Sequence, residues 1–172
     1  MSKILFIAFC LLCFCDAPLF SIELKDIENN YKKIFPAAAA VREATANGKT
    51  YYSVLDESGK QTGIILYTER KGYEGLIKLI TGFDPDAKIA TYLMSHRETP
   101  HYVTEIVKPD FKKRFSGKGR EQLKLKQEDP KGEIDGVTGA TVTLKALVGG
   151  LSEAAELAEE ILKPKSKKDA DK

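Results

Sequence analysis

Apolar residues recur every three or four positions in two segments of the chain, a spacing that predicts two α-helices. The first segment is 24–35, and Pro36 ends it. Its apolar positions are Leu24, Ile27, Tyr31, Ile34 and Phe35. The second is longer and covers about 141–162. Its apolar positions are Leu144, Leu147, Val148, Leu151, Ala154, Ala155, Ala158, Ile161 and Leu162. Gly149 and Gly150 lie within this second helix and lower its intrinsic helix propensity.

Between these helices, four runs rich in β-branched and aromatic residues predict two β-hairpins. The first hairpin joins residues 50–55 to 62–67 through a turn at 57–60 that contains a glycine. The second joins 76–83 to 89–95 through a turn that contains a Pro-Asp pair. The two hairpins predict an antiparallel sheet in the first half of the domain.

Hairpins followed by helices, rather than strands and helices in alternation, predict an α+β fold. We expect an antiparallel sheet backed by helices, with the long helix at its C-terminal end. Short helical segments are predicted over 103–115, followed by an irregular basic stretch through 126. The length of 172 residues suits a single domain. Hydrophobic residues at 42% and charged residues at 30% exclude a wholly disordered chain, collagen and a protein with many membrane spans.

The most apolar run of the sequence, residues 4–15, lies near its beginning and contains all three cysteines, Cys10, Cys13 and Cys15. Lys3 precedes it, and the run is shorter than the roughly 20 residues that span a bilayer. We expect 1–21 to be a signal peptide that directs the protein out of the cytoplasm, to the periplasm. A retained N-terminal anchor and a lipidated cysteine are open alternatives. Cleavage would leave no cysteine for a disulfide, a metal site or a nucleophile.

The formal net charge of +2 hides an uneven distribution along the chain. The tail, 163–172, holds five lysines and two aspartates. The domain that we expect over 22–162 holds 21 basic and 22 acidic residues. We therefore expect a flexible Lys-rich tail on a nearly neutral domain, and no nucleic-acid partner.

Residues 135–143 read D-G-V-T-G-A-T-V-T and lead directly into the predicted C-terminal helix. The start of a helix presents unpaired backbone N–H groups, which favour an anion such as phosphate. Gly136 and Gly139 allow a close backbone approach, and Thr138 and Thr141 provide hydroxyl groups. On spacing alone, the pattern favours a helix start that caps its own backbone.

The segment D-G-V-T-G-A-T, 135–141, resembles the flavinylation motif of the FMN-binding domain family. That family includes the G subunit of Rnf-type electron-transport complexes and the C subunit of sodium-translocating NADH:quinone reductases. Two more segments are similar to the family in the same order, G-Y-E-G-L-I-K-L-I-T-G-F-D at 72–84 and H-R-E-T-P at 96–100. The similarity covers roughly 54–162. In the family, a separate flavin transferase that uses FAD joins the motif's last threonine, here Thr141, to the phosphate of FMN through a phosphoester.

The resemblance, together with the polar chemistry of the side chains, implies a set of cofactor-binding residues. They are Thr141 as the covalent attachment point, with Asp135, Gly136, Thr138, Gly139, Ala140, Tyr73, Glu98 and Thr99 as further contacts. Turn formation is the alternative role for Asp135 and Tyr73. The chain departs from the family at 101–103, where His-Tyr-Val replaces Gly-Leu-Gly, so we expect a reshaped pocket beside the flavin ring. His96 and His101 flank Glu98, but their spacing matches no metal signature, and we expect no metal site.

Together these patterns predict an exported protein that carries covalent FMN and passes electrons between membrane or periplasmic partners. An electron carrier or redox subunit is favoured over a self-contained enzyme, because the sequence has no second cofactor motif and little length for a substrate domain. The alternative is a flavin-free binding or regulatory module on the same fold.

Overall fold

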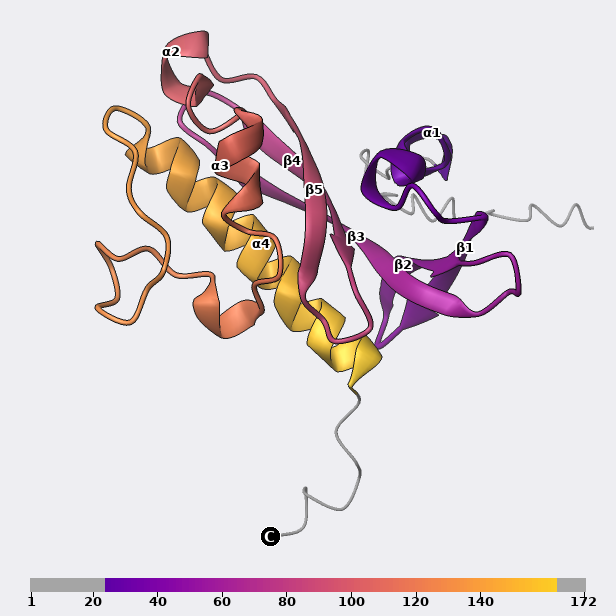
Figure 1. Ribbon diagram of the computed structural model, residues 1–172. Coiled ribbons are helices and arrows are strands. Elements are labelled where there is room, and N and C mark those ends of the chain that lie inside the picture. Colours follow the sequence, from indigo (N-terminus) through magenta and orange to yellow (C-terminus); the bar gives the residue numbers. More distant parts are fainter. Residues whose placement is uncertain (1–23, 164–172) are drawn as a thin grey trace, which may run out of the picture.

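The computed structural model describes residues 24–163, which form one antiparallel sheet with helices on both faces (Figure 1). The sheet has five strands in the order β1-β2-β3-β4-β5. They are β1 Ala40–Ala46, β2 Lys49–Leu55, β3 Gln61–Lys71, β4 Leu76–Phe83 and β5 Ile89–His96. The helices are α1 Leu24–Ile34, α2 Pro100–Val103, α3 Pro109–Lys113, the 3-10 helix η1 Arg120–Gln122 and α4 Thr141–Leu162. The predicted leader at 1–21, and the tail beyond Lys163, lie outside the described residues.

The predicted α+β class is confirmed, and so are both hairpins and both long helices. Strand β1 was not predicted, because its sequence A-V-R-E-A-T-A is poor in strand-forming residues. It pairs with β2 along its whole length as an edge strand. Asn47 and Gly48 connect the two strands with φ values of 52° and 72°. This Asn-Gly pair is a strong hairpin signal, and it would have located the strand.

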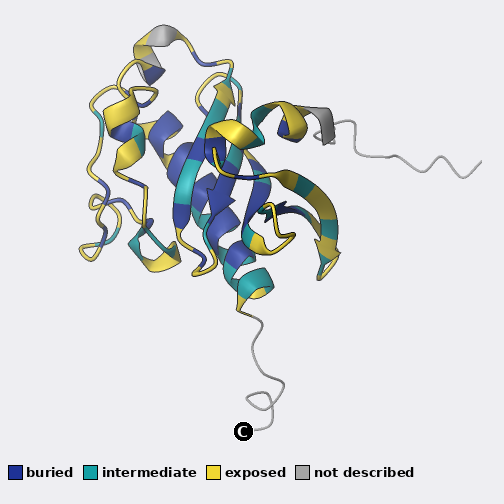
Figure 2. Cartoon of the chain, turned by 45° about the vertical axis from the view of Figure 1, so that its right-hand side comes forward, coloured by how far each residue is buried: buried dark blue, intermediate teal, exposed yellow. Residues whose placement is uncertain are grey.

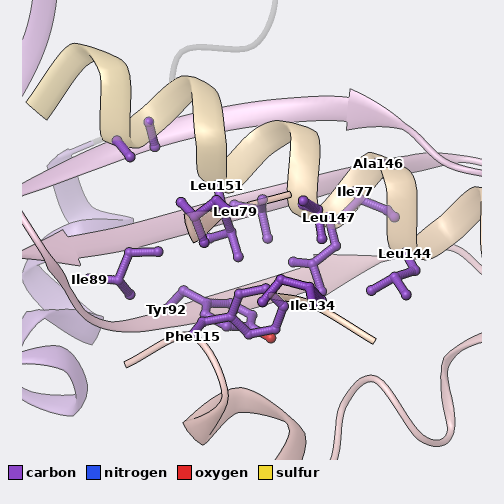
Figure 3. Close-up of a cluster of buried hydrophobic side chains, with 14 of the residues drawn as sticks. Ile77, Leu79, Ile89, Tyr92, Phe115, Ile134, Leu144, Ala146, Leu147 and Leu151 are labelled. Atoms are coloured by element: carbon purple, nitrogen blue, oxygen red, sulfur yellow. The ribbon is translucent and has the colours of Figure 1, made fainter. Parts of the chain in front are cut away.

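Helix α4 covers one face of the sheet and packs on β3 and β4. Figure 3 shows Leu144, Leu147 and Leu151 of this helix pointing toward Ile77 and Leu79 of β4. Both the central strands and the inner side of α4 are buried, whereas β1 has no buried residue (Figure 2). The long C-terminal helix is therefore fixed along the sheet by its apolar side.

Helix α1 covers the opposite face of the sheet through a second, smaller apolar cluster. Ile27 and Ile34 are buried there against Val54 and Ile65. A Cβ atom added at Gly82 would overlap both Ile34 and the Phe35 ring, so the glycine in β4 lets this helix end come close to the sheet.

The two glycines within α4 differ in their surroundings. A Cβ atom at Gly150 would lie 2.7 Å from Leu79 Cδ1, and Thr68 Oγ1 donates a hydrogen bond of 3.1 Å to the Gly150 carbonyl. A Cβ atom at Gly149 would meet nothing within 4 Å. The glycine at 150 therefore allows α4 to approach β3 and β4 closely, which offsets its low helix propensity.

Between β5 and α4 the chain forms two short helices and then a long loop that contains η1. Helix α3 lies within the predicted range 103–115, whereas α2 begins three residues before that range. Buried Phe115, Leu123, Leu125 and Ile134 attach this loop to the main core. Leu125 and Ile134 form a parallel bridge, in which the Lys126 N–H donates to the Ile134 carbonyl and the Ile134 N–H donates to the Lys124 carbonyl. This bridge positions the chain just before the attachment region that leads into α4. No helix of residues 24–163 is long and apolar enough to span a membrane.

Candidate functional site

The attachment loop, which we define as residues 135–140, ends in a tight turn immediately before α4. The Ala140 N–H donates a hydrogen bond of 3.1 Å to the Val137 carbonyl, and Gly139 within the turn has φ of 79°. This positive φ is the conformation that glycine adopts without steric cost. Thr141 follows as the first residue of α4, and it is exposed. The turn thus places the threonine hydroxyl at the protein surface.

The start of α4 offers backbone N–H groups to an anion. Ala140 occupies the N-cap position, makes no side-chain cap, and accepts the first helical hydrogen bond from the Leu144 N–H at 2.8 Å. The first turn contains no acidic residue. The positive end of the helix dipole is therefore not neutralised by a carboxylate of that turn, and a phosphate on Thr141 would be stabilised there.

Glu98 lies behind this helix start and is buried, with 6% of its surface exposed. Its Oε1 accepts hydrogen bonds from the N–H groups of Glu74 and Gly75, both at 3.0 Å. Its Oε2 accepts one from the Tyr73 N–H at 3.1 Å and one from the Thr143 hydroxyl at 2.8 Å. The carboxylate therefore joins the β3–β4 turn to the first turn of α4.

The charge of Glu98 is stabilised by these donors. Burial acts to raise the pKa of its carboxyl, but the N–H groups of Gly75, Glu74 and Tyr73 and the Thr143 hydroxyl outweigh burial and lower it. A Cβ atom at Gly72 would overlap the Glu98 carboxylate, so this glycine leaves the space that the carboxylate fills. Glu98 is thus an ionised group held inside the protein by its own chain.

Thr141 and Thr143 point in different directions, as their two-residue spacing on a helix predicts. Thr143 is 1% exposed, and its hydroxyl is used by Glu98. The Thr141 side chain is exposed. Of the two threonines in the first turn of α4, Thr141 is the one that another protein can reach.

Asp135 and Gly136 lie at the other end of the attachment loop, against the segment that contains Lys126 and Gln127. Lys126 Nζ lies 2.6 Å from Asp135 Oδ1, and this hydrogen bond and the positive charge lower the pKa of the Asp135 carboxyl. Both side chains are exposed. Gly136 faces the Gln127 side chain so closely that a Cβ atom would overlap it. These contacts hold the beginning of the loop, while Val137 packs against the main core.

The other predicted site residues lie around the same end of the molecule. Tyr73 is 57% exposed in the β3–β4 turn, and the Thr99 N–H donates to Glu74 Oε2 at 2.9 Å. Thr138 is exposed in the attachment loop. His101 of α2 lies beside the same loop, with its Nε2 atom 3.8 Å from the place a Cβ would take on Gly139. The structure thus brings together three segments that are far apart in the sequence.

Two structural contributions to this site were not predicted, namely those of Gly72 and Thr143. Both lie in or beside the three motifs, but a linear motif does not show which side chain will bond to Glu98. Among residues 24–163 there is no group of three or more histidine, cysteine or acidic side chains that could hold a metal ion. An exposed threonine, available N–H groups and a glycine turn together fit a phosphoester-linked cofactor.

Comparison with known proteins finds one matching family model and several similar proteins. Residues 72–156 match the family model described as the FMN-binding domain. The chain is 33% identical over 112 residues to the G subunit of the proton-translocating ferredoxin:NAD(+) oxidoreductase complex of Clostridium ljungdahlii, covering 64% of this chain and 60% of that relative. It is 27% identical over 151 residues to the G subunit of the ion-translocating oxidoreductase complex of Methanosarcina acetivorans, covering 82% and 79%.

Among solved structures, the chain is similar to NqrC of Shewanella oneidensis. The TM-score is 0.50 at 22% sequence identity, and the match covers 68% of this chain and 65% of that one. This likeness supports the fold. The chain spans about three fifths of the length of the Clostridium relative and about two thirds of the Shewanella one.

Proposed function

We propose, from the match of residues 72–156 to the model of the FMN-binding domain family, that the chain is an exported electron-transfer protein that carries FMN on Thr141 through a phosphoester. The observation that carries the proposal is the position of Thr141. This residue is exposed at the first position of α4, after a turn whose positive φ favours glycine at Gly139. The FMN would supply the electron-accepting ring.

The N–H groups at the start of α4 would stabilise the negative charge of the phosphate on Thr141. A threonine hydroxyl is a weak nucleophile without an activating base or metal. We therefore assign activation of Thr141 to a flavin transferase that uses FAD, and this chain is the substrate of that enzyme. The exposed position of Thr141 suits recognition by such a partner.

The remaining predicted residues divide into two roles. Tyr73, Thr138 and Gly139 are exposed near the helix start and are proposed as contacts of the cofactor. Glu98 is proposed to position α4, because its carboxylate already accepts four hydrogen bonds from the chain. Asp135, Gly136, Thr99 and Ala140 are proposed to shape the loops around the site.

Redox partners in a membrane complex are proposed from the relatives, whose names describe them as subunits of ion-translocating or proton-translocating oxidoreductase complexes. The site would then exchange electrons with neighbouring subunits rather than transform a substrate of its own. Export across the membrane is part of the same proposal and rests on the pattern of residues 1–21.

Coexpression with a flavin transferase tests the proposed attachment. The wild-type protein should stay yellow after acid denaturation, because an ester bond keeps the flavin on the unfolded chain. Thr141→Ala should lose this colour, whereas Thr50→Ala, which removes an exposed threonine hydroxyl from β2 away from the site, should keep it. A wild-type protein without covalent flavin would contradict the proposal and favour the flavin-free module.

A further inference from the structure

Strand β1 is the outer strand of the sheet, and its outer edge is open. Among residues 24–163, β2 is its only partner strand, and the pairing runs from Ala40 to Ala46 without a break in register. In an antiparallel pair, every second residue points its backbone N–H and C=O groups away from the partner strand. The outer edge of β1 therefore presents a row of backbone groups that can pair with a further strand.

The opposite edge of the sheet, on β5, is partly closed by the chain itself. The Ile89 N–H donates to the Lys118 carbonyl at 3.0 Å, and the Gly117 N–H donates to the Ile89 carbonyl at 2.8 Å. Edge strands are commonly protected by proline, lysine or a β-bulge, and β1 has none of these. Of the two edges of this sheet, the one on β1 is the more open to pairing.

The rest of the protein stabilises β1 only weakly. None of its residues is buried, and only Val41 and Thr45 are β-branched. The part of β1 after Glu43 pairs with 49–51 of β2, and the pairing of β2 with β3 begins only at Tyr52. This end of the hairpin is thus a two-stranded ribbon, which is marginally stable by itself. A strand on the outer edge would supply the hydrogen bonds and side-chain pairs that β1 lacks.

Two charged residues at the centre of β1 restrict what can pair with it. Arg42 and Glu43 are exposed, and as neighbours in a strand they point to opposite faces of the sheet. If two copies of the chain paired antiparallel through β1, the register that uses the whole strand would put Glu43 opposite its own copy.

The other two-fold registers of β1 with itself are no better. A shift in one direction puts Arg42 opposite its own copy, and a shift in the other direction leaves Ala40 and Val41 unpaired. Like charges directly opposite each other destabilise a strand pair, whereas opposite charges stabilise it. The charge pattern therefore disfavours a second copy and favours a segment with an acidic residue opposite Arg42 and a basic residue opposite Glu43.

We propose that the open edge of β1 binds an extended segment of a different polypeptide as a sixth, antiparallel strand with this complementary pair of charges. Figure 1 shows the β1–β2 hairpin on the side of the molecule away from α2 and the start of α4. A partner bound there would hold the domain and leave the end that contains Thr141 uncovered. The inference does not rest on the proposed function, because β1 contains no residue of the candidate site.

Two synthetic peptides of identical composition test this edge. In the antiparallel register, T-T-V-K-E-V-T places its lysine opposite Glu43 and its glutamate opposite Arg42, and T-T-V-E-K-V-T exchanges the two charges. The first should bind about fivefold more tightly, because two opposite-charge pairs replace two like-charge pairs. It should also slow the hydrogen exchange of the outward N–H groups of 40–46, which NMR measures residue by residue.

Exchanging the two charges in the protein should reverse the preference between the peptides. Arg42→Glu combined with Glu43→Arg keeps the net charge and should bind T-T-V-E-K-V-T more tightly. The matched control is Glu57→Lys combined with Lys60→Glu, which exchanges two exposed charges in the turn between β2 and β3. This control should keep the wild-type preference. Thermal unfolding followed by circular dichroism verifies that both variants are folded.

The inference is overturned if neither peptide, at millimolar concentration, slows the hydrogen exchange of 40–46. The same preference in the wild type and in the variant with exchanged β1 charges would also overturn it. A dimer in light scattering whose β1 is protected without any peptide would assign the edge to a second copy instead. These measurements use the chain without flavin, so their failure would leave the attachment of FMN to Thr141 untouched.

Discussion

Glu98 accepts two hydrogen bonds on each of its carboxylate oxygens, all from groups of the same chain. An ionised carboxylate offers about four such acceptor positions, so a ligand could bond to Glu98 only by displacing one of these donors. The residue therefore acts on the site through the backbone that it holds. It fixes the first turn of α4, and with it the position of Thr141, relative to the β3–β4 turn.

Replacing Glu98 by Gln should destabilise the protein by about 3 kcal/mol at neutral pH, because the buried N–H donors lose a charged acceptor and then face an amide NH₂ group. Urea unfolding measures this change. Glu74→Gln is the control, since Glu74 is exposed and its side chain accepts a single backbone N–H. Its loss should cost less than about 1 kcal/mol. Equal losses in both variants would contradict the buried role of Glu98.

The same residue predicts how stability depends on pH. Because the pKa of Glu98 is lowered in the folded protein, its contribution is complete above the ordinary glutamate pKa of about 4.3 and is lost as the pH falls through the folded value. The difference in unfolding free energy between wild type and Glu98→Gln should therefore shrink below about pH 4. A difference that stays constant to strongly acidic pH would contradict an ionised Glu98.

Helix α4 contains a pair of adjacent glycines whose effects on stability should be opposite. Gly149→Ala should stabilise the protein by up to about 1 kcal/mol, because the new methyl group meets nothing and alanine favours the helix. Gly150→Ala should destabilise it, because the methyl group would press on the buried Leu79 side chain. Thermal unfolding of the two variants compares them directly. Stabilisation by both would show that α4 does not pack on the sheet as described.

At the scale of elements, the sequence predicted those structures whose periodicity is strong. The apolar spacing of α1 and α4 and the β-branched runs of β2 to β5 can each be recognised within a short stretch of sequence, without knowledge of distant residues. Strand β1 lacks such a run, and its place in the sheet depends on pairing with β2. The close approach of α4 at Gly150 also depends on residues of two distant strands, so the sequence indicated only a weakened helix there.

At the scale of the whole molecule, the candidate site collects at one end of the sheet, where the β3–β4 turn, α2 and the start of α4 meet (Figure 1). Its three motifs could be recognised in the sequence because each is local. The bond between Glu98 and Thr143 spans 45 positions, so it does not follow from a linear pattern. The folded chain determines how the three motifs lie relative to one another, which the motifs alone do not specify.

Export of the whole molecule is a separate prediction from the sequence. The N-terminus of protein isolated from its native cell should lie near Ile22, because the signal-like pattern ends at Ser21. N-terminal sequencing of the extracytoplasmic fraction measures this. Soluble cytoplasmic protein that still begins with Met1 would contradict export.

The central claim is that FMN is bound covalently at Thr141, and peptide mapping by mass spectrometry tests it most directly. Trypsin should release residues 132–145 as one peptide, which contains Thr138, Thr141 and Thr143. From protein made with a flavin transferase, this peptide should carry the mass of one FMN less one water, and fragmentation should place that mass on Thr141. An unmodified peptide, or a flavin located on Thr138 or Thr143, would contradict the assignment.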